Sequence, residues 1–130
     1  MTRATGTAGP LLLAIDQGTH ASRALVFDAL GGIVARGERE IALVRPQPDW
    51  AEQDGEEIVA SVHAAVAQAV AELGPRAAEI GAAGLSSQRA SCVCWDRVSG
   101  ALLSPIFSWQ DRRMHAWIDE LAAHGDDVHR

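Results

Sequence analysis

Short apolar runs separated by turn residues mark the first third of the chain. The run from Leu11 to Ile15 is continuously apolar and ends at Asp16, which is the pattern of a strand covered on both faces. Two further runs, at residues 23–28 and 33–36, lie on either side of Gly31-Gly32. Paired glycines between two such runs favour a tight reversal. The pattern therefore predicts a first strand followed by a hairpin.

The middle of the chain has the pattern of an amphipathic helix. Asp54 is placed to cap it, and two glutamates in the first turn suit the positive end of the helix dipole. Gly74 and Pro75 end the pattern. Apolar residues recur at spacings of three or four and predict one core-facing stripe: Ile58, Val62, Val66, Val70 and Leu73.

The remaining apolar segments are short. Four of them predict strands, at residues 41–44, 80–85, 92–95 and 106–109. Asp111 is the predicted cap of a last helix that ends near Gly125 and turns four residues inward: Met114, Trp117, Ile118 and Leu121. The order of elements predicts an α/β fold with a mixed sheet and flanking helices, of the ribonuclease H type. The pattern leaves the strand order open.

Composition narrows the classes of function. The chain has 130 residues, room for one domain, and we expect residues 1–9 to be a mobile leader before a single domain at residues 10–130. Eleven basic and 17 acidic side chains give a net charge of −6 without a long basic run, which argues against nucleic acid as a partner. The run from Leu11 to Ile15 is too short to span a membrane, so we expect a cytoplasmic protein with no membrane partner.

Two other groups of side chains are candidates for a metal site or an anion site. Cys92 and Cys94 are too few for a structural zinc site, and we interpret them as buried strand residues, with Trp95 beside them in the core. Two cysteines this close also fit a reducing compartment. Arg112 and Arg113 could face an anion or lie in solvent.

The polar turn at residues 16–23 contains the groups that a phosphate site needs. Asp16 ends a buried strand, where its charge requires water, a pairing partner or a cation such as Mg²⁺. Gly18 lets a ligand approach the backbone, and the hydroxyls of Thr19 and Ser22 can join the amide donors around phosphate oxygens. Arg23 adds positive charge. The same residues also suit an ordinary hairpin turn, so spacing alone leaves both interpretations open.

An ordered set of five segments resembles the FGGY family of carbohydrate kinases, and glycerol kinases in particular. The set covers nearly the whole chain after the leader, and it is more specific than an isolated Asp-x-Gly-Thr motif. The segments are Ala14–Thr19 with Ser22–Asp28, Pro46–Asp54, Ser87–Arg89, Val93–Asp96, and Ser108–Arg113.

The resemblance implies an actin-like architecture, with ATP and Mg²⁺ as cofactors and a small sugar or polyol as substrate. Such transfer depends on positioning and on neutralisation of charge. By resemblance, Asp16 would organise Mg²⁺, Thr19 would contact the transferred phosphate, and Arg23 would reach the nucleotide phosphates. The implied phosphate-binding set is completed by Gly18, His20 and Ser22. The implied substrate-binding set is Arg89, Ala90 and Trp109, where Arg89 would hold a hydroxyl and Trp109 would form an apolar wall.

The sequence departs from the glycerol kinase pattern at two places. Ala90 stands where glycerol kinases have Glu, so a charged acceptor for a polyol hydroxyl is missing and the substrate can differ from glycerol. His20 and Ala21 replace hydroxyl residues of the phosphate loop, which leaves more of the binding to backbone amides.

The resemblance also implies what this chain lacks. The family's general base and adenosine pocket belong to sequence beyond Arg130, so we expect an incomplete N-terminal kinase domain that is inactive alone and that can form a homo-oligomer as part of the full-length protein. The first alternative is a non-catalytic nucleotide- or sugar-binding module of the same fold. An actin-like chaperone ATPase ranks last, because it does not explain Gln88-Arg89 or the segment at 109–113.

Overall fold

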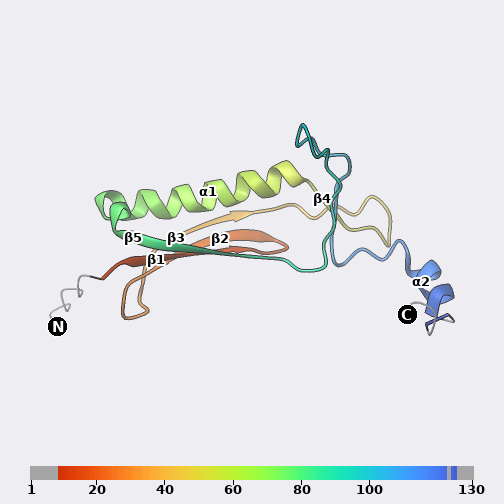
Figure 1. Cartoon of the computed structure of the whole chain (residues 1–130), viewed down its shortest axis with the longest axis horizontal. Helices are drawn as coiled ribbons and strands as arrows, with labels where there is room; N and C mark the ends of the chain where they lie inside the picture. Colours follow the sequence, from red (N-terminus) through yellow and green to blue (C-terminus); the bar gives the residue numbers. More distant parts are fainter. Residues whose placement is uncertain (1–8, 123, 126–130) are drawn as a thin grey trace.

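The computed structural model describes residues 9–122, 124 and 125 (Figure 1). Apart from Gly9, the predicted leader lies outside the described residues. The elements in chain order are β1 (Leu11–Gln17), β2 (Ala21–Phe27), β3 (Ile33–Glu40), β4 (Glu52–Gln53), α1 (Gly55–Leu73), the 3₁₀ helix η1 (Gly74–Glu79), β5 (Ile80–Ser87), β6 (Ile106–Phe107) and α2 (His115–Ala122).

A four-stranded mixed sheet, in the order β3-β2-β1-β5, forms the body of the molecule. The pairs β1–β2 and β2–β3 are antiparallel, whereas β1 and β5 run parallel. The predicted reversal between β2 and β3 is confirmed, because Asp28 accepts hydrogen bonds from the backbone of Leu30 and Gly32, and Gly31 has a left-handed φ of 80°. β4 and β6 form a separate two-stranded ladder.

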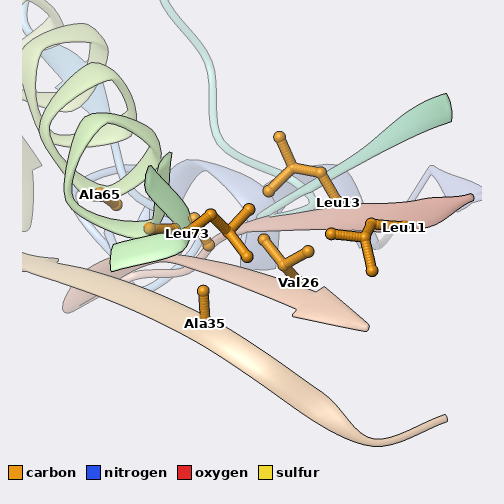
Figure 2. Close-up of a cluster of buried hydrophobic side chains, with 8 residues drawn as sticks. Leu11, Leu13, Val26, Ala35, Ala65 and Leu73 are labelled. Carbon is orange, nitrogen blue, oxygen red and sulfur yellow. The ribbon is translucent and has the colours of Figure 1, made fainter. Parts of the chain in front are cut away.

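Helix α1 lies along one face of the sheet (Figure 1). Asp54 caps it as predicted, and its carboxylate accepts from the backbone N–H groups of Glu56 and Glu57. Figure 2 shows side chains of α1 and of the strands meeting between the two layers. The core cluster consists of Leu11, Leu13, Ala24, Val26, Ala35, Ala65, Ala69 and Leu73.

The ridge of α1 that is most buried differs from the predicted stripe. It runs through Ser61, Ala65, Ala69 and Leu73, while the valines at 62, 66 and 70 flank it and are only partly buried. The cause is the close approach of α1 to β3, since a Cβ added to Gly37 would lie 2.0 Å from the carbonyl oxygen of Ala65. Only small side chains fit where the helix and the sheet are closest.

Two of the predicted strands are absent from the part of the chain that the structure describes. Residues 41–44 and 92–95 make only isolated bridges, which join Val44 to Glu52, Cys92 to Phe107 and Trp95 to Leu102. Both cysteines are exposed, and Trp95 is 59% exposed, so their predicted burial was wrong. The reason is that the turn at residues 96–100, closed by the Asp96 carboxylate, folds this segment into a short loop outside the main sheet.

The prediction for the last helix was also partly wrong. α2 begins at His115, and the carboxylate of Asp111 binds the Ala51 N–H and Arg113, so it does not cap the helix. The residues predicted to face inward at 114, 117 and 118 are half-exposed or more. Figure 1 shows the reason, because α2 lies at the far end of the molecule, away from the sheet and α1.

One segment, Gly55–Glu79, is long and apolar enough to cross a membrane by length and composition alone. Helices that pack within a protein core can pass the same test. In this structure α1 packs one face, the ridge of small residues, against β2 and β3.

We predict that Gly37→Ala lowers the free energy of unfolding by about 2–4 kcal/mol, because the new methyl group must push α1 away from β3. Gly84→Ala is the matched control, since a Cβ there meets no atom within 4 Å, and we expect a change below about 1 kcal/mol. Urea denaturation followed by circular dichroism measures both. Equal effects of the two substitutions would contradict the close contact.

Candidate functional site

The ends of two parallel strands bring the candidate loops together. β1 and β5 pair in register, with Gln17 beside Ser87, and the N–H of Gln88 continues the ladder by donating to the Gln17 carbonyl at 2.9 Å. Because the strands point the same way, the segments that follow them leave the sheet at the same edge. The turn at residues 18–20 therefore lies beside residues 88–90.

These two loops line an open cleft of about 620 Å³. Its lining residues are Asp16, Gln17, Gly18, Thr19, Ser87, Gln88, Arg89, Ala90 and Trp109. Six of them are residues that the sequence analysis selected, from both the phosphate-binding and the substrate-binding sets. The structure thus brings together groups that are as many as 93 positions apart in the chain, from Asp16 to Trp109.

The turn after β1 is tight and is tied to the opposite wall. The N–H of Gly18 donates to the Ala21 carbonyl at 2.9 Å, and a Cβ on Gly18 would lie only 3.2 Å from that oxygen. The indole Nε1 of Trp109 donates to the Thr19 hydroxyl at 2.9 Å. The predicted apolar wall and the predicted phosphate loop are therefore in direct contact.

Ser22 does not lie in this cleft, and its assignment as a phosphate-binding side chain needs correction. Its hydroxyl is fully buried beneath α1 and shares a hydrogen bond of 2.8 Å with the Ser61 hydroxyl. The reason is strand alternation, because β2 already includes Ser22, and its side chain falls on the helix-covered face.

The other two residues of the predicted phosphate set lie outside the lining of the cleft. Arg23 pairs with Asp16 across the β1–β2 ladder, and its guanidinium forms an exposed ion pair with Glu38 at 2.7 Å. Such exposed pairs contribute little to stability, so the Arg23 side chain can exchange this partner at low cost. His20 is exposed, and its carbonyl accepts from the Ile41 N–H.

Sequence reasoning gave no role to a buried polar group beneath the cleft. Gln53 is 1% exposed, and its Nε2 donates to the Thr19 carbonyl at 2.8 Å while its Oε1 accepts from Gln88 Nε2 at 2.9 Å. Ser91 adds a further bond to Gln88. Hydrophobic periodicity does not reveal such a residue. The only signal in the sequence was that Gln53 and Gln88 fall within segments that resemble the FGGY family.

Comparison with known proteins decides the family. The profile described as the N-terminal domain of the FGGY family of carbohydrate kinases matches residues 11–129. The chain belongs to the FGGY family. Two curated relatives are the glycerol kinase of Acinetobacter baylyi, 44% identical over 88% of this chain, and glycerol kinase 1 of Pseudomonas aeruginosa, 44% identical over 90%. The chain spans about a quarter of the length of these relatives, 23% and 24%.

Solved structures share the fold of this FGGY chain and confirm the actin-like architecture. The xylulose kinase from Rhodospirillum rubrum superposes with a TM-score of 0.80 at 25% identity, over 88% of this chain and 23% of that one. The Plasmodium falciparum glycerol kinase with ADP gives a TM-score of 0.77 at 22% identity, over 92% of this chain and 24% of that one.

A compact charged cluster holds residues 108–113 in place. The guanidinium of Arg113 binds Glu52 at 2.6 Å and Asp111 at 2.8 Å, and it lies over the rings of Trp50 and Phe107. Its side chain is only 19% exposed. Arg113 is therefore an internal structural cation that faces carboxylates of this chain, while Arg112 is exposed. The cluster fixes the segment that presents Trp109 to the cleft.

The backbone beside Arg89 is strained. Ala90 has a φ of 57°, in the left-handed region that residues with a Cβ rarely adopt. A left-handed conformation costs a non-glycine residue roughly 1–2 kcal/mol. Strain of this kind is often found at binding sites, and here it occurs in the cleft lining itself.

Among the described residues that line the cleft, Asp16 contributes the one carboxylate. Among the described residues, no group of three or more His, Cys, Asp or Glu side chains could hold a metal by itself. One carboxylate is nevertheless the donor set that Mg²⁺ uses when phosphate oxygens and water supply the remaining ligands. The residues present therefore fit Mg²⁺ that arrives with a nucleotide.

The cluster around Arg113 predicts a pH dependence. The Arg113 hydrogen bond is the main cause that lowers the pKa of Asp111 from 3.8 to about 2. Because the pKa is lower in the folded state, the stabilisation is present above about pH 4 and is lost as the pH falls through about 2. We expect urea unfolding to show a steeper loss of stability between pH 4 and pH 2 in the wild type than in Asp111→Asn. Parallel pH curves for the two proteins would contradict this assignment.

Proposed function

We propose that this chain is the phosphate-loop portion of an ATP-dependent kinase that transfers the γ-phosphate of ATP to a hydroxyl group of a sugar or polyol in the cytoplasm. One observation carries the proposal. The turn predicted to bind phosphate and the residues predicted to bind substrate line the same cleft, with Thr19 and Trp109 in contact. The curated relatives named glycerol kinase support the same class of reaction.

On the nucleotide side, the groups available are the amides of the turn, the Thr19 hydroxyl and Asp16. Amide donors and a hydroxyl suit the phosphate oxygens, since they stabilise negative charge without a change of protonation. Mg²⁺, when bound, would neutralise charge on the phosphates, and Asp16 would hold it at the end of β1. Arg23 lies on the neighbouring strand opposite Asp16 and would exchange Glu38 for a phosphate.

On the substrate side, Arg89 would donate hydrogen bonds to a hydroxyl, and the ring of Trp109 would cover the carbon chain. Ala90 offers a methyl group where the glycerol kinase pattern has a carboxylate. A site without that acceptor binds each hydroxyl of glycerol less specifically. The proposed substrate is accordingly a small sugar or polyol, with no preference for glycerol built into this position.

The proposal assigns the remaining parts of the reaction to the rest of the kinase. By resemblance to the family, the general base and the adenosine pocket belong to other parts of the kinase. We therefore expect this chain alone to bind ligands without transferring phosphate. Binding, rather than turnover, is the appropriate test for it.

We predict that the chain binds Mg-ATP in a calorimetric titration and that Thr19→Ala weakens binding about tenfold, which corresponds to about 1.4 kcal/mol for one lost hydrogen bond to a charged ligand. Thr19→Ser keeps the hydroxyl and should bind within about twofold of the wild type. Ser22→Ala should bind as the wild type does, because the Ser22 hydroxyl is buried under α1. A folded wild-type chain without affinity for Mg-ATP would refute the proposal, as would equal losses in the variants at 19 and 22.

A further inference from the structure

Five hydrogen bonds form a closed ring below the cleft. The backbone N–H of Trp109 donates to Ser91 Oγ at 3.2 Å, and Ser91 Oγ donates to Gln88 Oε1 at 3.3 Å. Gln88 Nε2 then donates to Gln53 Oε1 at 2.9 Å, and Gln53 Nε2 donates to the Thr19 carbonyl at 2.8 Å. Trp109 Nε1 closes the ring by donating to Thr19 Oγ1 at 2.9 Å. The first four bonds all donate in the same direction, so each can strengthen the next.

Gln53 is the buried member of this ring. Gln53 is 1% exposed, and Trp109 is 56% exposed. The other members, Thr19, Gln88 and Ser91, are partly buried. The Thr19 carbonyl can only accept a hydrogen bond, so the amide nitrogen of Gln53 must face it. The oxygen then faces Gln88. Both ends of one rigid amide are thus committed, each to a different loop of the cleft.

The bond to Thr19 also orients the phosphate loop. A trans peptide unit is planar, and its C=O and N–H point in opposite directions. Because the Thr19 carbonyl is turned toward buried Gln53, the N–H of His20 is turned away from the interior. An outward N–H in this turn is the donor that a phosphate oxygen requires.

The bond to Gln88 has the corresponding effect on the other loop. Gln88 leads directly into Arg89 and the strained Ala90, and Ser91 joins this loop to the backbone of Trp109. A shift of Gln53 would therefore move the phosphate turn and the substrate wall together. Gln53 thus bonds to both loops without itself lining the cleft.

We propose that Gln53 is a positioning residue that couples nucleotide binding to substrate binding across the cleft. This inference rests on the proposed function. When a nucleotide orders the Thr19 turn, the ring transmits that order to Gln88 and Trp109, so a polyol then binds a site that is already formed. The coupling is reciprocal, because each ligand must change the affinity of the other by the same factor.

The test is a thermodynamic cycle with named probes. The affinity for Mg-AMP-PNP, a non-hydrolysable ATP analogue, is measured by calorimetry with and without saturating glycerol, and again with D-xylulose. In the wild type we expect either glycerol or D-xylulose to tighten nucleotide binding at least fivefold. Gln53→Met keeps the shape of the side chain without its hydrogen bonds, and it should reduce that factor to below twofold.

Two further variants serve as controls. Gln68→Met removes an exposed amide on α1 that accepts from the Glu38 N–H, and it should keep the wild-type coupling factor. Ser91→Ala opens the ring at a partly buried position, and it carries the test if Gln53→Met does not fold. If Gln53→Met folds and keeps the full coupling factor, the proposal is overturned. If Gln53→Met does not fold, full coupling in Ser91→Ala overturns it. So does a wild type that binds both ligands without coupling.

A ligand-free measurement separates this inference from the proposed function. Amide hydrogen exchange should become faster in Gln53→Met at both Gly18 and Gln88, whose N–H groups donate to the carbonyls of Ala21 and Gln17, and at neither in Gln68→Met. If the wild type binds no ligand, the proposed function fails, and the exchange result alone decides whether Gln53 ties the two loops together. Faster exchange in one loop only, or in neither, would overturn the positioning role.

Discussion

The candidate site depends on the parallel pairing of β1 with β5. This pairing is the single parallel contact in the four-stranded sheet, and it forces the chain to leave both strands at the same edge. The phosphate turn and the Arg89 loop are neighbours for that reason. An antiparallel arrangement would place them at opposite ends of the sheet, however well each segment matched its family pattern.

Helix α1 packs closely on the β2–β3 side of the same sheet. The approach of the helix to Gly37 presses a ridge of small residues onto β2 and β3, and the Ser61–Ser22 hydrogen bond fixes the start of β2. Gln17 and Ser22 are register partners, as are Asp16 and Arg23. Alternation therefore divides the turn residues between a structural face under the helix and an exposed face that carries the charged groups.

Polar contacts then attach residues 108–113, which lie outside the main sheet, to β4. Arg113 binds Asp111 in its own segment and Glu52 in β4, and the amide of Gln53 links β4 to the two loops. Buried polar groups cost free energy unless they are paired, and among the described residues every such side chain in this region has a partner. The site is thus supported by directional hydrogen bonds and ion pairs. Apolar contacts in the same place would tolerate small shifts of the loops.

Local signals in the sequence were sufficient for the elements that local signals control. The first strands, the Asp54 cap and the end of α1 follow from short patterns. The resemblance to the FGGY family selected Asp16, Thr19 and Trp109, and the structure places them in one cleft. The exceptions depend on distant partners. Asp111 has the sequence of a cap but binds the Ala51 N–H, and α1 turns its alanines inward because of Gly37 on another strand.

The most direct test of the whole account is a chimaeric enzyme. Residues 11–129 would replace the matched segment of the Acinetobacter baylyi glycerol kinase, which supplies the rest of the kinase. Phosphate transfer from ATP would be measured for glycerol, xylulose and other small polyols in a coupled assay. We expect a folded chimaera to phosphorylate at least one of them, with activity abolished by Asp16→Ala. A folded chimaera that binds ATP and polyol but transfers no phosphate to any of them would contradict the claim that this cleft is a kinase half-site.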